Sequence, residues 1–338
     1  MKNLRISSIR GHERAVLALL FALTLCACVL SLCVGSVALG PGELWAVLTG
    51  QQTGGSAYTI LRFARLPRTV GCLLAGSALA VSGAVIQGVL SNPLAAPNVI
   101  GVNSGAGLMV ALSCALAPAS LALTPVMAFL GALMGVLLVL LLAERTGAAR
   151  ITVVLAGVAV SSIFSAAIDA VVTFVPDALN GYADFRVGGV SGLTMDRLLP
   201  AAWVILPALL GVLLLTHELD LLLLGGDTAR SLGLHAGRAR VLLLTLAAAL
   251  AGGAVSFCGL LGFVGLIVPH ILRRLVGEES RFLIPACALG GALLLTVCDV
   301  LARVLFAPYE LSVGIVLALL GGPFFIWLLL GQRGGRSA

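Results

Sequence analysis

Long apolar runs, each about twenty residues in length, recur from one end of this sequence to the other. A hydrocarbon core about 30 Å thick needs about 20 apolar residues in each helix that crosses it. Charged residues make up only 10% of the 338 residues, too few to cover the surface of a soluble protein of this size. The sequence therefore predicts an all-α polytopic membrane protein, with one transmembrane domain over residues 1–338 and no soluble domain.

The apolar runs predict ten membrane-spanning helices. Their ranges are 15–39, 69–90, 98–117, 121–143, 151–175, 198–217, 241–258, 260–276, 283–302 and 310–330. The third range holds several glycines and the eighth holds Pro269, residue types that interrupt regular helix.

The distribution of basic residues predicts the orientation. An even number of spans places both ends on one side, and both ends are basic, with Lys2 and Arg5 at the start and Arg333 and Arg336 at the finish. If that side is cytoplasmic, it carries 14 of the 20 lysines and arginines, as the positive-inside rule requires. The predicted location is a bacterial inner membrane, with a short basic N-terminus of about residues 1–14 in the cytoplasm. Orientation thus accounts for the net charge of +6, and we infer no nucleic-acid partner.

Residues 91–107, SNPLAAPNVIGVNSGAG, hold three Asn, two Pro and three Gly between two apolar runs. Irregular backbone at membrane depth is tolerated only where protein or a water-filled cavity satisfies its polar groups. Two glycine pairs nearby, Gly101 with Gly105 and Gly131 with Gly135, have the four-residue spacing that brings membrane helices into close contact.

A polar segment at about 219–237 separates the sixth and seventh spans on the cytoplasmic side. Gly225 and Gly226 end the apolar run, and Asp227 is a suitable N-cap for a short helix over 228–232. Gly233 suits the left-handed residue that ends a helix. Such a capped surface helix fits either a docking site for a soluble partner or an ordinary structured loop.

Four blocks, in this order, resemble the permease subunits of bacterial type II ABC importers for iron–siderophores, haem and vitamin B12. They are Leu66-Pro67-Arg68-Thr69 with the run over 73–107, GGDTARSLGL at 225–234, GFVGLIVPH at 262–270, and ELSVG at 310–314 with GGPFF at 321–325. The resemblance extends over about residues 60 to 330.

The resemblance implies that the segment at 225–234 is a coupling loop seated in a cytoplasmic ATPase. The residues that carry this role are Asp227, Thr228, Ala229, Arg230, Ser231, Leu232 and Gly233. Because the sequence contains no GxxxxGK[ST] motif, the chain itself is predicted to be no enzyme, and ATP–Mg is expected on a separate subunit. The implied assembly is a homodimer of permeases with two ATPases and an external substrate-binding protein.

The resemblance also assigns the polar stretch and three external arginines. Asn92, Pro93 and Leu94 match residues of a cytoplasmic gate between the two permeases. Basic positions that meet acidic residues of the binding protein match Arg65, Arg68 and Arg303. Arginine suits this contact because its guanidinium pairs bidentately with a carboxylate.

The resemblance places the substrate pathway along the fifth span and the segment after it, about 156–192. Asp169 lies in that span, where a carboxylate near the bilayer centre costs about 2.5–3.5 kcal/mol unless it is paired or hydrated. It faces either the pathway or a polar partner within the bundle. Arg186 stands where the family has an apolar run, and either attracts an anionic chelate or faces water.

The predicted cargo is a metal chelate, first an iron(III)–siderophore, with haem and vitamin B12 as alternatives. His270 follows Pro269 in a family motif and is interpreted as helix-end structure, so no metal site is predicted. The rival from another class is an ion-driven secondary transporter with Asp169 as its ion site. No HExxH, GxSxG or paired-Asp motif supports an intramembrane enzyme.

Overall fold

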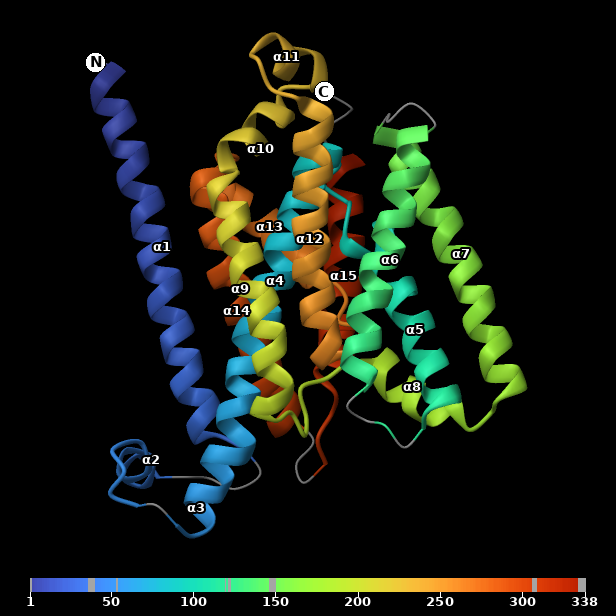
Figure 1. Cartoon of the computed structure of the whole chain (residues 1–338). Helices are drawn as coiled ribbons and strands as arrows, with labels where there is room; N and C mark the ends of the chain where they lie inside the picture. The colour runs from blue at the N-terminus through green and yellow to red at the C-terminus, as the bar shows by residue number, and fades with distance from the viewer. Residues whose placement is uncertain are drawn as a thin grey trace.

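A computed structural model of the chain describes residues 2–35, 40–52, 54–118, 120, 123–145, 150–305 and 309–333. Every regular element within these ranges is helical. The long helices are α1 (Lys2–Cys33), α4 (Leu66–Leu90), α5 (Val102–Leu116), α6 (Leu123–Arg145), α7 (Arg150–Phe174), α9 (Met195–Leu214), α12 (Ala236–Cys258), α13 (Val264–Val276), α14 (Ser280–Val304) and α15 (Val313–Arg333). They run roughly side by side in a single bundle (Figure 1).

Each predicted span overlaps one of these helices. Within the described ranges, seven helical stretches are long and apolar enough to cross a membrane; each comprises all or most of one of the helices α1, α4, α6, α7, α9, α12 and α14. The other three predicted spans correspond to α5, α13 and α15. One difference lies before α4, where α3 (Ser56–Thr59) and the π-helix η1 (Ile60–Arg65) form one continuous stretch with it. Pro67 lies inside this continuous stretch, where its missing N–H leaves one backbone hydrogen bond unmade just after the π-helical turn of η1.

Helix α4 forms the centre of the bundle, packed against α12, α13 and α14. Nearly all of its residues from Gly71 to Leu90 are buried. Gly76 lies against Gly291 and Gly83 against Gly265, so closely that a Cβ atom at any of these positions would overlap the facing backbone. The glycines of α4 are therefore a packing requirement.

The close helix contact predicted from the glycine spacing is confirmed, and the two glycine pairs prove to face each other. Gly105 packs against Gly131, and Gly101 packs against Gly135, where α5 and α6 meet. The glycine at 101 also has φ +82, a conformation that glycine adopts without strain, at the start of α5.

The bundle has two distinct ends (Figure 1). Both chain termini and the short helices α10 (Thr216–Leu223) and α11 (Gly226–Ser231) lie at one end, which we call the terminal end. The opposite end carries α2 (Pro41–Leu48), α3 and α8 (Ala178–Val187).

Candidate functional site

The predicted coupling segment protrudes from the terminal end as α11, beyond the ends of the long helices (Figure 1). Gly225 before it and Gly233 after it both have positive φ, +103 and +88, so the chain turns sharply on each side. Ala229 is buried, whereas Leu232 is 59% exposed. The segment thus presents a large apolar side chain and the charges of Asp227 and Arg230 to solvent.

The prediction that Asp227 caps this helix is wrong. The helix begins at Gly226, two residues earlier than expected, Gly225 takes the N-cap position, and no side chain caps it. The Asp227 carboxylate lies 3.4 Å from the Arg230 guanidinium in a fully exposed ion pair. Within α11, Ser231 donates its hydroxyl hydrogen to the backbone carbonyl of Asp227 at 2.8 Å.

The predicted gate lies in an irregular turn that follows α4 at the terminal end. Ser91 ends α4 in the left-handed conformation, with φ 46. Asn92 then accepts a hydrogen bond from the backbone N–H of Leu94 at 3.0 Å through its side-chain oxygen. A single-turn 3-10 helix, η2 (Pro97–Ile100), leads into α5. The Asn92 side chain therefore stabilises the turn that joins α4 to η2.

The gate turn and α10 border the same cavity of about 280 Å³, which Asn92, Pro93, Leu219 and Leu223 line together. Leu219 packs so closely on Gly88 that a Cβ atom there would come within 2.9 Å of its side chain. Movement of α10 would therefore be felt at the end of α4, directly before the gate turn.

Helix α10 is also bonded to α14. The Asp220 carboxylate accepts a hydrogen bond from the backbone N–H of Ser280, the first residue of α14, at 3.0 Å. Gln87 of α4 bridges in a similar way to α13: it donates to the carbonyl of Gly265 and accepts from Arg273. Helix α10, which precedes the predicted coupling segment, is thus attached to α14 through Asp220 and to α4 through Leu219.

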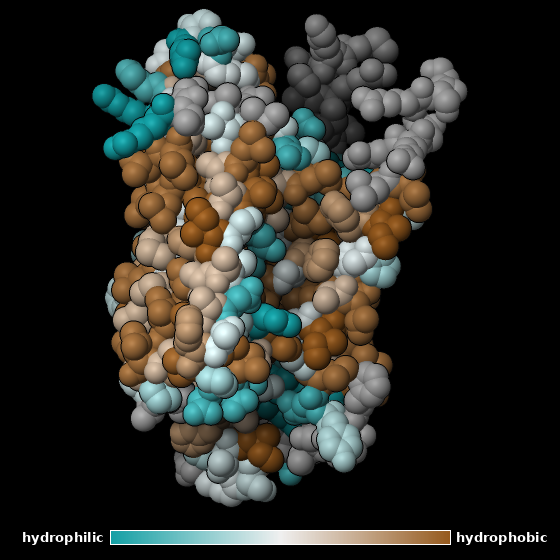
Figure 2. All heavy atoms as spheres, turned by 90° about the vertical axis from the view of Figure 1, so that its right-hand side faces the viewer, coloured by the Kyte–Doolittle hydropathy of each residue, from teal (hydrophilic) through white to brown (hydrophobic). Residues whose placement is uncertain are grey.

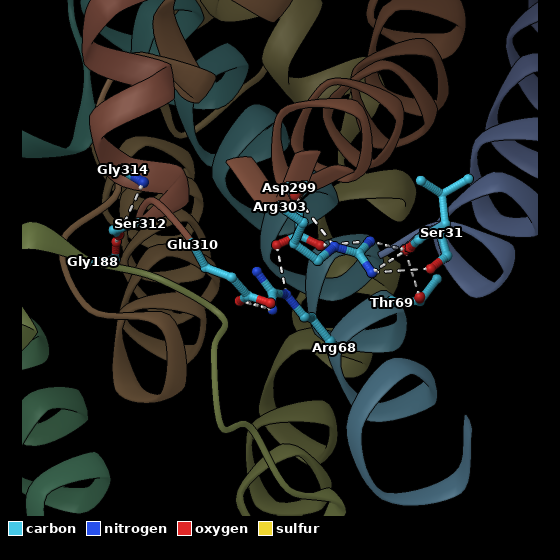
Figure 3. Close-up of polar contacts among 10 residues, drawn as sticks. Ser31, Arg68, Thr69, Gly188, Asp299, Arg303, Glu310, Ser312 and Gly314 are labelled. Atoms are coloured by element: carbon cyan, nitrogen blue, oxygen red, sulfur yellow. Dashed lines mark hydrogen bonds and ion pairs between the residues drawn. The ribbon is translucent and has the colours of Figure 1, made fainter. Parts of the chain in front are cut away.

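The three predicted docking arginines converge at the opposite end of the bundle. Arg68 of α4 donates to Asp299 of α14 at 2.8 Å and to Glu310, just before α15, at 2.7 Å (Figure 3). The Asp299 side chain has no solvent exposure, while that of Glu310 is 35% exposed. One guanidinium therefore joins a deeply buried carboxylate to one at the surface.

Arg303 and Arg65 extend this cluster to α1. Arg303 lies 3.1 Å from the second carboxylate oxygen of Asp299 and donates to the hydroxyl and carbonyl of Ser31. Arg65 donates to the carbonyls of Leu32 and Cys33 at the end of α1. All three guanidinium-bearing residues are mostly buried, at 9% exposure or less.

These internal contacts give the arginines a structural role that the sequence did not reveal. The cluster still borders an open cavity of about 290 Å³ at the opposite end, lined by Arg65, Arg68, Arg303 and Glu310. Docking of a binding protein at these residues stays a prediction.

The two pathway candidates lie near the opposite end, on α7 and α8. Asp169 is exposed, five residues before the end of α7 rather than at mid-helix, and it makes no ion pair within the described part of the chain. Arg186 is exposed at the end of α8. Both charges act on Tyr182: burial raises the pKa of its phenol, Arg186 lowers that pKa and Asp169 raises it. A polar partner for Asp169 within this bundle, one of the two alternatives, is therefore not found among the described residues.

Asp299, Glu310 and Asp220 were not predicted as site residues. Asp299 could have been found, because an acidic residue inside a predicted span is a functional or structural signal in itself. Asp220 and Glu310 lie at span borders, where acidic residues are common and carry no such signal.

Comparison with known proteins places these features in a family. The model of the FecCD transport family matches residues 23–331. The hemin transport system permease protein of Yersinia pestis is 38% identical over 336 residues, which cover 97% of this chain and 99% of that protein. The Fe(3+) dicitrate transport system permease protein of Escherichia coli (strain K12) is 36% identical over 325 residues, covering 95% and 100%. A solved inward-facing structure of a metal-chelate type ABC transporter superposes with a TM-score of 0.82 at 29% identity, covering 94% of this chain and 99% of that chain.

Proposed function

The chain belongs to the FecCD transport family, and we propose that it is the permease subunit of an ATP-driven importer that carries an iron(III)–siderophore into the cytoplasm. The observation that carries the proposal is α11, a short exposed helix held between two positive-φ glycines beyond the ends of the membrane helices. A chain with no ATP-binding motif of its own needs such a surface to receive work from a separate ATPase.

The proposed assembly contains two copies of this chain, two cytoplasmic ATPases and an external binding protein. The terminal end faces the cytoplasm, since it carries α11, both termini and the arginines at 230, 238, 240, 273, 274 and 281. The opposite end receives the binding protein, and acidic side chains of that protein enter the cavity lined by Arg65, Arg68 and Arg303.

Coupling follows the contacts from α11 to the gate. ATP-driven closure of the ATPases moves α11 and α10, and Leu219 passes the displacement to Gly88 and the gate turn at Asn92, Pro93 and Leu94. ATP can drive this change only if it binds the two conformations of the complex with different affinity.

The cargo is a metal chelate. The relatives named above carry hemin and iron(III) dicitrate by name. An iron(III)–siderophore is our first choice, with haem and vitamin B12 as alternatives. Neither cargo nor cofactor binds permanently to this chain in the proposed cycle.

Affinity purification of the tagged chain from its native membrane tests the assembly, since an ATPase subunit should purify with it. Replacing Arg230 and Leu232 by Ala should then leave the protein inserted while import per ATP hydrolysed falls strongly. Asp196→Ala, an exposed change at the opposite end, is the control. Unchanged import in the Arg230/Leu232 variant would remove α11 from the mechanism.

A further inference from the structure

Helix α7 leaves one face uncovered by the other described parts of the chain. It contacts α5, α6, α8 and η2, all on its other side. The uncovered face is apolar toward the terminal end, where Leu155 and Val158 are 62% and 57% exposed. Toward the opposite end it becomes polar.

The polar half is a single stripe of exposed residues, Ser162, Ser165, Asp169 and Thr173, which we call the α7 stripe. Their spacing of three or four residues places them on one side of the helix. Figure 2 shows a narrow column of hydrophilic residues crossing the otherwise hydrophobic face on which α7 lies. The Asp169 carboxylate within this line cannot face lipid without large cost. The stripe therefore faces water.

Two hydroxyl groups of the stripe, those of Ser162 and Thr173, have their hydrogens bonded within the helix and can accept further hydrogen bonds. Ser162 donates its hydrogen to the carbonyl of Val158 at 2.9 Å, and Thr173 donates to the carbonyl of Asp169 at 2.7 Å. Together with the Asp169 carboxylate, which makes no ion pair in the described ranges, they form a surface that accepts hydrogen bonds and carries negative charge.

Arg186, an exposed base that also acts on Tyr182, does not cancel this charge. Arg186 lies on α8, and the charges of both Arg186 and Asp169 reach the Tyr182 hydroxyl, but no contact joins the two residues directly. Asp169 is therefore available to a solute that passes along α7.

We propose that the α7 stripe lines the outer half of the pathway and selects chelates that carry hydrogen-bond donors or positive charge, against anionic carboxylate chelates. The proposal rests on the proposed function only in placing this face at the pathway between two permeases. It narrows the cargo to a chelate such as a ferric trishydroxamate with a free ammonium group, and it disfavours ferric citrate.

Thiol labelling tests the stripe without ATP, ATPase or cargo, so a failure of ATP-driven import would leave this result standing. Ser165→Cys in membrane vesicles is treated with a cationic and an anionic methanethiosulfonate, and the parent chain, with its eight native cysteines, gives the background. Because residues four apart on a helix are neighbours, one charge at Asp169 should make the cationic reagent about tenfold faster than the anionic one. Adding Asp169→Asn should bring the two rates close together.

Two matched variants sharpen the result. Ser162→Cys, farther from Asp169, should show the same preference with a smaller ratio. Leu206→Cys on α9, exposed at similar depth but on an apolar surface, should react with neither reagent. The proposal is overturned if Ser165→Cys reacts as slowly as Leu206→Cys, if both reagents react equally fast, or if Asp169→Asn leaves the ratio unchanged.

The cargo class is tested by protection of the same thiol in the complex with the ATPase. Millimolar ferric trishydroxamate bearing an ammonium group should slow labelling of Ser165→Cys more than its N-acetylated form does, and ferric citrate should not slow it. Equal protection by ferric citrate, or protection by none of the three chelates, would overturn the assignment of cargo class.

Discussion

Asp299 carries its charge at a point that solvent does not reach, and two arginines compensate it. Arg68 and Arg303 lie within 2.8 and 3.1 Å of its two carboxylate oxygens. Three helices meet through these contacts, since Arg303 also binds Ser31 of α1. Removing one partner of a buried ion pair leaves the remaining charges uncompensated, which costs far more than the pair itself contributes.

Asp299→Asn should therefore destabilise the protein by about 3–5 kcal/mol, because the amide keeps an acceptor for Arg68 but removes the only fully buried negative charge of the described cluster. The measurement is the thermal unfolding transition in detergent. Asp227→Asn, which removes one partner of an exposed ion pair, is the matched control and should leave the transition where it is. Equal melting of Asp299→Asn and the unaltered chain would contradict the structural role of the cluster.

At this scale the sequence predicted residue types better than their partners. The convergence of Arg65, Arg68 and Arg303 was foreseen, but their acceptors on α1, α14 and Glu310 depend on long-range packing that a linear motif does not record. Asp227 was placed as a helix cap from local preference alone. The observed helix begins at Gly226, which shifts the carboxylate into the first turn and out of the capping position.

The contact between α5 and α6 depends on four glycines whose facing backbones nearly touch. Gly131→Ala should force the helices apart and cost about 1–3 kcal/mol, because the added methyl group would overlap the carbonyl of Gly105. Gly11→Ala in α1 is the control, since open space surrounds that position and alanine favours helix by about 1 kcal/mol. The measurement is the thermal unfolding transition of both variants. If the Gly131→Ala protein were as stable as the Gly11→Ala protein, α5 and α6 would pack more loosely than the structure shows.

The bond between α10 and α14 gives a second prediction for an element. Asp220→Ala should remove the acceptor for the first N–H of α14, lower stability by about 1 kcal/mol and reduce import per ATP. Asp220→Asn keeps the acceptor oxygen and should behave like the unaltered chain. If the Ala variant imports as efficiently as the Asn variant, this bond plays no part in coupling.

Helices could be predicted from the sequence where a long apolar run marks them. Each of the ten apolar runs overlaps one helix in the right order, because a long apolar run is a strong signal for a helix in hydrocarbon, although α13 and α5 have only 13 and 15 residues. Short elements such as α8, α10 and η1 carry no such signal. The extension of α4 back through η1 depends on a π-helical turn, which hydrophobic patterning does not indicate.

Across the whole molecule, the gate turn, α10 and α11 lie together at the terminal end, while the arginine cluster, the α7 stripe and α8 lie toward the opposite end. Helix α14 reaches both regions: Asp220 caps its start and Asp299 anchors its finish. A displacement at one end can therefore reach the other through one continuous helix, as the proposed ATP-driven mechanism requires.

Vesicles that contain this chain alone should accumulate no chelate under an ion gradient. Among the described residues Asp169 has no charged partner with which to form an ion site, and the proposed mechanism takes its energy from an ATPase that acts on α11. Adding the ATPase, the binding protein and ATP should start uptake. The rival mechanism, an ion-driven transporter, predicts uptake by the chain alone and its abolition by Asp169→Asn. Under the mechanism proposed here, Asp169→Asn should alter the preference among chelates and leave the binding-protein-stimulated rate of ATP hydrolysis near its original value. Gradient-driven accumulation without any partner would therefore reject an ATP-driven permease outright.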